Sequence, residues 1–207
     1  MTVSAILTAA GESSRMGSPK PLLPWPSGRG DDTTLVEYQV SQLRCAGIDE
    51  IIVVLGHMAD EVEPLVGGAG VKSVLNPDYL RGKTTSIRAG LAKIDPGAET
   101  VVLLAVDQPR PASIIRRVLQ AHALTGAAVT SPLHLGRGGH PIAFDSLLLP
   151  ELGEITEEGQ GIREVIGRHL SRVHRVEIED PVVRLDLNTP EDYRRGYDGA
   201  AGLTAAT

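Results

Sequence analysis

Short, continuous apolar runs alternate along this chain with segments whose apolar residues recur at helical spacing. Strand-length runs occur at Val3–Thr8, Glu50–Leu55 and Thr100–Val106. Runs of this kind are typical of strands that are buried on both faces of a parallel sheet. The segments Leu35–Cys45 and Ala112–Thr125 have the apolar periodicity of helices. The alternation predicts an α/β protein, in which a mostly parallel central sheet lies between two layers of helices, a three-layer arrangement.

The rest of the chain keeps this rhythm to about residue 132 and a looser one beyond it. We expect strands at Val71–Leu75, Ala127–Ser131, His140–Asp145, Arg172–Glu179 and Val183–Leu187, and helices at Ala59–Leu65, Thr84–Ile94, Gly161–Leu170 and after Thr189. Thr189 is an N-cap candidate, and Pro190 suits the first helical turn. The composition of Trp25–Thr34 indicates a loop. Without a repeat or a linker, we expect one domain over residues 1–198 and a flexible tail over 199–207.

The loop after the first apolar run combines glycines, serine hydroxyls and two cations. It extends from Gly11 through Arg15 and Gly17 to Lys20. Backbone N–H groups at the end of a strand, together with Arg and Lys, typically bind an anion, most often phosphate. The spacing excludes a Walker loop and a three-glycine dinucleotide fingerprint. An ordinary strand-to-helix turn with solvated charges is the alternative, but two cations in one short loop favour phosphate binding.

Two aspartates stand where strands of the expected sheet end. Asp107 follows Thr100–Val106, and Asp186 lies on or at the end of Val183–Leu187. Ligands bind beyond the carboxyl ends of strands in open α/β sheets, so Asp107 should face the same edge as the Gly11–Lys20 loop. A carboxylate near a polyphosphate suits Mg²⁺, which needs only one or two protein carboxylates. Taken alone, each aspartate is also typical of a turn or a helix cap.

Ser86 and His140 are further candidate ligand contacts. Ser86 lies at an expected helix start, where hydroxyls and free N–H groups can bind a ribose, a base or a phosphate. A plain helix cap is an equally good interpretation. His140 stands in the constrained turn Gly138–Pro141 and is the histidine best suited to contact a substrate. The six histidines show no pairing at metal-ligand spacing, so a zinc site is not expected.

The net charge and the cysteine content limit which compartment and which partners we expect. The 207 residues carry a formal net charge of −6 and a single cysteine. This charge argues against a nucleic-acid surface, and the absence of an internal disulfide fits a reducing compartment. There is no charged-then-apolar leader and no apolar run long enough to span a bilayer. We therefore expect a cytoplasmic protein that binds small molecules and has neither nucleic acid nor membrane as a partner.

Together, these motifs resemble the MobA-like nucleotidyltransferase family of NTP transferases. The matching segments, in the family's order, are Leu7-Thr8-Ala9-Ala10-Gly11…Arg15-Met16-Gly17…Pro19-Lys20-Pro21-Leu22-Leu23, Asp107-Gln108-Pro109, Gly139-His140-Pro141, Gly161-Ile162-Arg163 and Asp186-x-Asn188-Thr189-Pro190-Glu191-Asp192. Within the family, the chain is similar to molybdenum cofactor cytidylyltransferases, which tend to have Ala-Ala-Gly where guanylyl-transferring members have a second glycine; Ala10 stands at that place. The resemblance implies a Rossmann-like nucleotidyltransferase fold with Mg²⁺.

The resemblance also implies a role for each matched residue. The nucleotide-binding set would be Ala9, Ala10, Gly11, Arg15, Lys20, Ser86 and Asp107, of which Arg15, Lys20 and Asp107 would be catalytic. Asp107 and Asp186 would hold the metal, and His140 would contact the acceptor. Two departures from the family stand out. Asn188 stands where the family often has an aspartate, and this neutral residue would weaken metal binding unless Asp186 is the ligand. The loop 25–34 looks longer than usual in the family, which leaves the identity of the acceptor open.

The implied activity is transfer of CMP from CTP to a phosphorylated acceptor such as molybdopterin, with release of pyrophosphate. A molybdoenzyme or chaperone would be the protein partner. The nucleophile would be a phosphate oxygen that is already anionic, so no general base is required. Three other classes stay open: a sugar-phosphate nucleotidyltransferase, a non-catalytic nucleotide-binding module, and an oxidoreductase. The absent dinucleotide fingerprint argues against the last of these.

Overall fold

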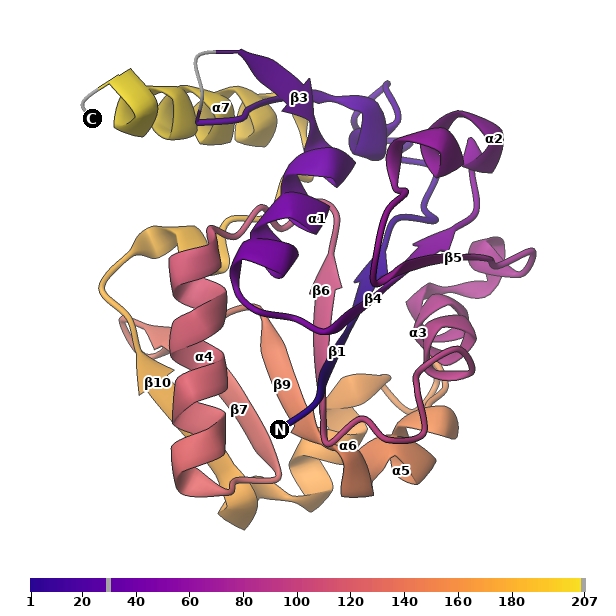
Figure 1. Ribbon diagram of the computed structural model, residues 1–207, viewed down its shortest axis with the longest axis vertical. Coiled ribbons are helices and arrows are strands. Elements are labelled where there is room, and N and C mark those ends of the chain that lie inside the picture. Colours follow the sequence, from indigo (N-terminus) through magenta and orange to yellow (C-terminus); the bar gives the residue numbers. More distant parts are fainter. Residues whose placement is uncertain (29–30, 206–207) are drawn as a thin grey trace.

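The computed structural model describes residues 1–28 and 31–205 of the chain. Its centre is an eight-stranded sheet with the order β10-β7-β9-β6-β1-β4-β5, and β8 pairs with β7 outside this path (Figure 1). The strands of this sheet are β1 (Val3–Thr8), β4 (Glu50–Leu55), β5 (Val71–Leu75), β6 (Thr100–Ala105), β7 (Val129–His134), β8 (Arg137–Gly138), β9 (Ile142–Asp145) and β10 (Val173–Glu177). The predicted α/β class with a mostly parallel sheet is therefore confirmed.

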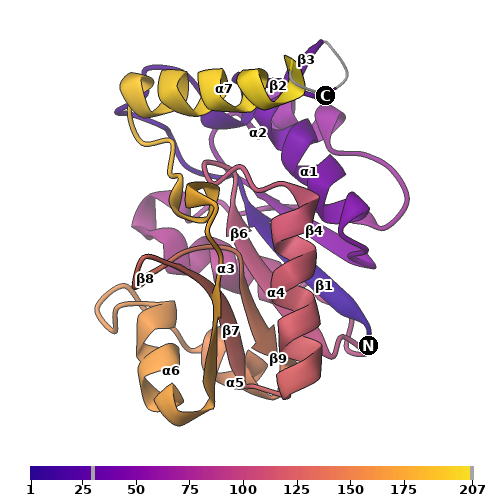
Figure 2. The ribbon, with the colours of Figure 1, turned by 90° about the vertical axis from the view of Figure 1, so that its left-hand side faces the viewer.

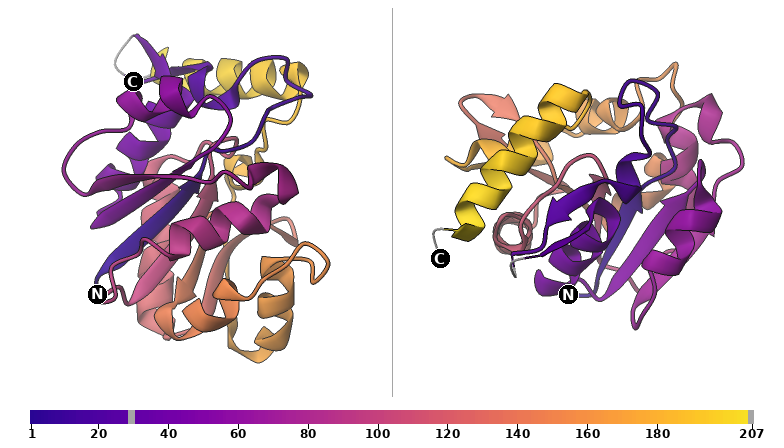
Figure 3. Two further views of the ribbon diagram at one scale, coloured as in Figure 1. Left: turned by 90° about the vertical axis from the view of Figure 1, so that its right-hand side faces the viewer. Right: turned by 90° about the horizontal axis from the view of Figure 1, so that it is seen from above.

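Helices cover both faces of the sheet. They are α1 (Leu35–Cys45), α2 (Ala59–Val62), α3 (Lys83–Leu91), α4 (Ala112–Thr125), α5 (Leu149–Gly153), α6 (Ile162–Arg168) and α7 (Pro190–Ala205), with short 3-10 turns η1 (Lys20–Leu22), η2 (Glu63–Leu65), η3 (Tyr79–Arg81), η4 (Ser146–Leu148), η5 (Leu170–Arg172) and η6 (Pro181–Arg184). Figures 2 and 3 show α1 and α4 on one face and α3, α5 and α6 on the other. This is the predicted three-layer arrangement.

Two apolar cores, one on each side of the sheet, follow from the alternation of side chains along the central strands. Ala5 and Leu7 of β1 lie in the core under α1 and α4, whereas Ile6 lies in the core under α3, α5 and α6. All three side chains are fully buried. A strand that is apolar on both faces can be accommodated only between two helical layers, which explains the continuous apolar runs.

Strand direction decides which loops meet at one edge of the sheet. β1 runs parallel to β4 and to β6, so the segments that follow these strands leave the sheet at the same edge. β9 runs antiparallel to β6. An antiparallel strand begins where its neighbours end, so His140, just before β9, lies at the same edge as Asp107, just after β6. The crossover from parallel to antiparallel pairing thus adds a histidine to an edge otherwise built from strand ends.

Helix starts agree with the capping residues in the sequence. Thr34 caps α1 in a reciprocal capping box with Glu37, whose Oε2 accepts a hydrogen bond from the Thr34 N–H at 3.0 Å. At α7, the Thr189 hydroxyl accepts from the Asp192 N–H at 3.1 Å, and the Asp192 carboxylate accepts from the Thr189 N–H at 3.1 Å. The N-cap prediction for Thr189 is confirmed.

The segment 25–34 differs from the loop predicted for it. β2 (Pro24–Pro26) pairs antiparallel with β3 (Asp32–Thr34), and only Arg29 and Gly30 lie outside the described residues. The indole of Trp25 anchors this hairpin, because it is buried and its ring lies about 6 Å from those of Tyr38 and Tyr193. Figure 2 shows α7 lying along the hairpin. Prolines and glycines in the sequence pointed to a loop, whereas aromatic packing against α7 stabilises two short strands.

The C-terminal segments also differ from expectation. The strand predicted at Val183–Leu187 is wrong, because η6 is followed there by irregular chain, and Asp186 therefore does not end a strand. Two backbone carbonyls of this segment, those of Val183 and Leu185, accept hydrogen bonds from the Arg110 guanidinium instead of a neighbouring strand.

α7 continues to Ala205, so residues 199–205 are helical, where a flexible tail was predicted for 199–207. Alanine favours a helix, and the alanines of the segment outweigh its glycines. Residues 206–207 lie outside the described part of the chain. Within the described part, no helix is long and apolar enough to cross a membrane.

Candidate active site

A cavity of about 290 Å³ opens at the carboxyl edge of the central strands. Its lining comes from the loop after β1, from the start of α3 and from the end of β6, together with Asn188 near the start of α7. The predicted nucleotide residues that line it are Ala9, Ala10, Gly11, Arg15, Lys20, Ser86 and Asp107. Residues up to about one hundred positions apart in the sequence thus come together, because they lie at the same edge of the sheet.

Backbone contacts shape the loop after β1. The Ala9 N–H donates to the Val54 carbonyl at 2.8 Å, and the Ala10 carbonyl accepts from the His57 N–H at 3.0 Å. A Cβ on Gly56 would lie 2.6 Å from the Ala10 carbonyl oxygen, so only glycine allows the end of β4 to pass this close. The loop is therefore held against β4, on the floor of the cavity.

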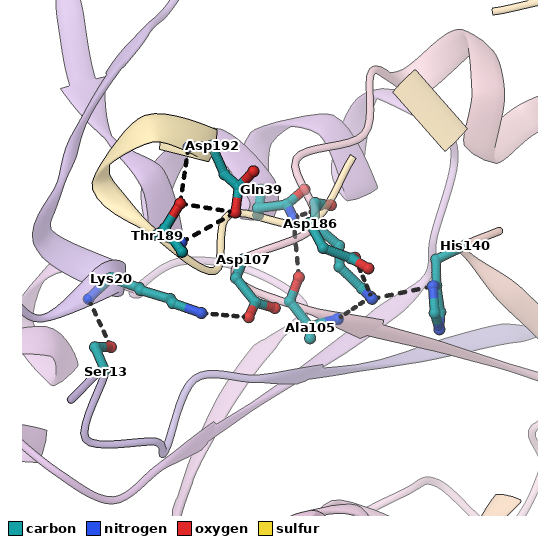
Figure 4. A network of polar contacts seen from close by, with 10 residues as sticks. Ser13, Lys20, Gln39, Ala105, Asp107, His140, Asp186, Thr189 and Asp192 are labelled. Carbon is teal, nitrogen blue, oxygen red and sulfur yellow. Dashed lines mark hydrogen bonds and ion pairs between the residues drawn. The ribbon is translucent and has the colours of Figure 1, made fainter. Parts of the chain in front are cut away.

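Lys20 and Asp107 form an ion pair at one side of the cavity. The Lys20 Nζ lies 2.6 Å from Asp107 Oδ2, and the two side chains are 13% and 19% exposed. Figure 4 shows the lysine reaching across to the aspartate, while its own backbone N–H donates to the Ser13 hydroxyl at 3.0 Å. The predicted phosphate-binding cation and the predicted metal ligand thus neutralise each other. Arg15 is exposed and forms no ion pair with any described residue.

Ser86 lies in the first turn of α3, and its side chain is buried at the cavity wall. Its hydroxyl oxygen accepts a hydrogen bond from Asn76 Nδ2 at 2.9 Å. The hydroxyl proton remains available to donate into the cavity. Asn76 is itself buried, and its contact with Ser86 was not foreseen from the sequence.

A second, larger cavity of about 810 Å³ adjoins the first and shares Thr8, Lys83 and Ala105 with it. His140 and Asp186 line this second cavity and not the first. Its lining combines aliphatic side chains with two arginines, Arg163 and Arg175. The predicted acceptor contact, His140, is thus separated from the phosphate loop by the wall that the two cavities share.

A polar network links the residues between the two cavities (Figure 4). Gln108 Nε2 donates to Asp186 Oδ1 at 2.9 Å and lies 3.0 Å from His140 Nδ1. Gln39 Nε2 donates to the Gln108 carbonyl at 2.6 Å. The Asp107 carbonyl accepts from the Leu187 N–H at 2.8 Å. Side-chain and backbone contacts therefore hold the turn after β6, the turn before β9 and the segment before α7 together.

Arg110 lies beneath this network with no exposed surface. Its guanidinium donates to the carbonyls of His140, Val183 and Leu185 at 2.8–3.0 Å. Burial lowers the pKa of Arg110 to about 10, and the charges of Asp186 and Asp107 act against this change. The residue stays charged at neutral pH and gives the base of the site a fixed positive charge.

Burial first, and the Arg110 charge second, lower the pKa of His140 to about 4, although Asp186 and Asp107 act in the opposite direction. The imidazole is consequently neutral at physiological pH. Any ligand that contacts the ring would therefore meet a neutral hydrogen-bonding group, not a cation.

Three polar residues of this network were missed by reasoning from the sequence. Gln108 and Arg110 lie within three residues after Asp107, just beyond a buried strand, and polar residues at such a place indicate a site. Gln39 stands among Leu35, Val36, Val40 and Leu43 on the buried face of α1. A polar residue on an apolar helical face needs a buried partner, and this too was detectable.

The oxygen donors near Asp107 suit a magnesium ion. Asp107 Oδ2 already holds a cationic group, the Lys20 ammonium, and Asn188 lines the same cavity. Among the described residues, no cluster of three or more His, Cys, Asp or Glu side chains could hold a metal ion. Mg²⁺ needs only one or two protein carboxylates beside waters and phosphate oxygens, so the donor set fits. One oxygen of Asp186 accepts a hydrogen bond from Gln108. That Asp186 and Asp107 bind the metal together stays a prediction.

An open α/β sheet with a phosphate-type loop, two cations and an aspartate at its carboxyl edge defines a nucleotide-binding protein of the Rossmann-like class. The chain belongs to the MobA-like NTP transferase domain family, which matches residues 5–173. The sequence-based resemblance to this family is confirmed, and a nucleotidyltransferase is the kind of enzyme that the match supports.

Similar proteins include members with different activities. Molybdenum cofactor cytidylyltransferase of Escherichia coli (strain K12) is 32% identical, over 92% of this chain and 93% of its own length. Nicotine blue oxidoreductase of Paenarthrobacter nicotinovorans is 31% identical, over 93% of this chain and 95% of its own. The solved structure of Rv0371c from Mycobacterium tuberculosis H37Rv in complex with manganese is 28% identical, with a TM-score of 0.76 over 96% of this chain and 98% of that one.

Proposed function

We propose that this protein transfers CMP from CTP to a phosphorylated acceptor such as molybdopterin, with Mg²⁺, and releases pyrophosphate. The observation that carries the proposal is the pair of adjoining cavities. The first holds Lys20 and Asp107, and the larger second one holds His140 and Asp186. A nucleotide in the first cavity and an acceptor in the second would meet at the wall they share.

Two observations support CTP as the nucleotide. Ala10 stands where guanylyl-transferring relatives tend to have a second glycine, and it is buried in the loop beside Gly56. In addition, a cytidylyltransferase is among the relatives that align over nearly the whole chain. The manganese complex of a structural relative supports a divalent metal, for which the donor set around Asp107 suggests Mg²⁺.

The chain's own residues would act by positioning and by charge. An acceptor phosphate oxygen attacks the α-phosphorus of CTP, a new P–O bond forms, and the bond to the β-phosphate oxygen breaks, so that pyrophosphate leaves. Lys20 would leave Asp107 to bind the phosphates, and Arg15 would bind them from the exposed side of the loop. Because the nucleophile is already anionic, no side chain has to remove a proton. Bound Mg²⁺ would neutralise charge on the phosphate oxygens, with Asp107 as its protein ligand.

The test is pyrophosphate release from CTP, GTP, ATP and UTP, with molybdopterin or sugar 1-phosphates as acceptors, in the presence and absence of Mg²⁺. We expect release only with metal, with CTP preferred and molybdopterin as the acceptor. Lys20→Ala should lower turnover by about 2–4 kcal/mol of transition-state stabilisation, as does loss of one oxyanion donor. Lys93→Ala removes the same charge at an exposed position outside both cavities and should leave turnover unchanged.

Each alternative activity has its own outcome in these measurements. Release with sugar 1-phosphates alone would assign a sugar-phosphate nucleotidyltransferase. Nucleotide binding without any release would assign a non-catalytic module. Consumption of NAD(P)H would assign an oxidoreductase, the activity named for one relative of similar identity.

A further inference from the structure

The carboxamide of Gln108 lies between the two halves of the site, and its side chain is largely buried. Its Oε1 accepts a hydrogen bond from the Ala105 N–H at 3.2 Å. A backbone N–H can only donate, so the atom that faces it is the amide oxygen. The amide nitrogen must then face the other way, toward His140 and Asp186.

This orientation decides which nitrogen of His140 carries the proton. Gln108 Nε2 lies 2.9 Å from Asp186 Oδ1 and 3.0 Å from His140 Nδ1. Both N–H groups of the amide are therefore used, one by each partner. An amide nitrogen cannot accept, so His140 Nδ1 must be the acceptor, and the single proton of the neutral ring is on Nε2.

The Nε2–H of His140 is open to the second cavity. The ring lines that cavity, and Nε2 has no hydrogen-bond partner in the described part of the chain. Among the described residues, Trp25 Nε1 is the single side-chain nitrogen or oxygen that is both buried and without a partner. His140 Nε2 has no partner among them either, so it is not buried. The N–H is thus exposed to whatever the cavity holds and can donate to an anionic oxygen there.

We propose that Gln108 is a positioning residue for the second substrate: it sets His140 as the Nε2–H tautomer and holds Asp186. The second cavity then presents a hydrogen-bond donor, which suits an oxyanion of the acceptor, and a carboxylate, which suits a hydrogen-bond donor of the acceptor. Arg110 supports this arrangement from below, because its Nε donates to the His140 carbonyl at 2.9 Å. The part that concerns the acceptor rests on the proposed function, whereas the tautomer of His140 does not.

The first test is NMR of the ¹⁵N-labelled, unliganded protein at pH 8, with His140→Gln to assign the ring signals. We expect the Nε2–H tautomer for His140 in the wild type. In Gln108→Glu, a carboxylate that only accepts replaces the donating amide, so the ring proton should move to Nδ1. An Nδ1–H tautomer in the wild type would overturn the proposal without any variant. The same tautomer in wild type and Gln108→Glu would overturn it as well.

The second test is kinetic and uses a matched control. Gln108→Glu and Gln108→Leu should raise KM for the acceptor by about 10-fold or more, as expected for loss of a hydrogen bond to a charged group, and leave KM for CTP within about 2-fold. Gln42→Glu is the control, since Gln42 accepts from the Ala112 N–H through Oε1 and a carboxylate can do the same. Equal effects on both KM values would overturn the positioning role. Absence of turnover in the wild type would instead refute the proposed function and leave the tautomer result standing.

Discussion

Replacing Asp107 by Asn should strengthen the binding of metal-free CTP while it slows nucleotidyl transfer. In the unliganded protein, the Lys20 ammonium lies 2.6 Å from Asp107 Oδ2. A triphosphate that binds without metal has to draw Lys20 away from this partner, and it also meets the Asp107 charge. Asn has nearly the same shape without the charge, so Lys20 becomes free to bind phosphate. Two opposite effects of one substitution therefore follow from a single ion pair.

The geometry sets the size of both effects. The pair is largely buried, with 13% and 19% of the two side chains exposed, so solvent screens it only in part. A hydrogen bond to a charged group is worth about 1.5–3 kcal/mol, which corresponds to roughly 10- to 150-fold tighter metal-free binding in the variant. Loss of the carboxylate should cost about 2–4 kcal/mol of transition-state stabilisation, or roughly 30- to 1,000-fold in turnover.

Isothermal titration calorimetry with CTP in EDTA measures the first effect, and pyrophosphate release with Mg²⁺ measures the second. Asp60→Asn is the matched control, because Asp60 is exposed on α2 and lines neither cavity. Unchanged or weaker metal-free binding in Asp107→Asn would show that the ion pair does not compete with the nucleotide. Turnover close to the wild-type value would refute the role of Asp107 as a metal ligand.

Three further predictions concern stability. Gly56→Ala should lower the free energy of unfolding by about 1–3 kcal/mol, as overpacking does, because the new Cβ would lie 2.6 Å from the Ala10 carbonyl oxygen. Thr34→Ala should lower it by about 1 kcal/mol through loss of the capping box. For His140, the folded pKa of about 4 lies below the unfolded value of about 6.5, so the unfolded state takes up the proton first. The free energy of unfolding should therefore fall as pH decreases from about 6.5 to about 4, and His140→Gln should flatten this dependence.

Urea denaturation checks all three, with the last repeated across the pH range. Gly199→Ala is the control for Gly56→Ala, since no atom lies within 4 Å of the added Cβ and the position is inside α7. The control should gain up to about 1 kcal/mol, because alanine favours a helix over glycine. A Gly56→Ala protein as stable as the wild type would contradict the close approach of β4 to the loop. An unchanged pH dependence in His140→Gln would contradict the lowered pKa.

Elements whose structure follows from local pattern were predictable from the sequence. The bounds predicted for Val3–Thr8, Leu35–Cys45, Glu50–Leu55, Val71–Leu75 and Ala112–Thr125 agree with the structure residue by residue. Each is a run whose apolar residues indicate the element within its own length. Short, mixed segments failed, because their structure depends on partners. The hairpin of Trp25 needs Tyr193 of α7, and the chain around Val183 is held by Arg110, more than seventy residues away.

The candidate site divides in the same way. Local sequence was enough to indicate the chemistry available: a glycine-bounded loop with Lys20, an aspartate after a buried strand, and a histidine in a turn. Their arrangement depends on the fold, because an antiparallel β9 brings His140 to the edge where β6 ends, next to Asp107. The fold also pairs Lys20 with Asp107, and it places Gln108 beside His140. Such contacts join residues that local patterns cannot relate, since they depend on strand order and direction.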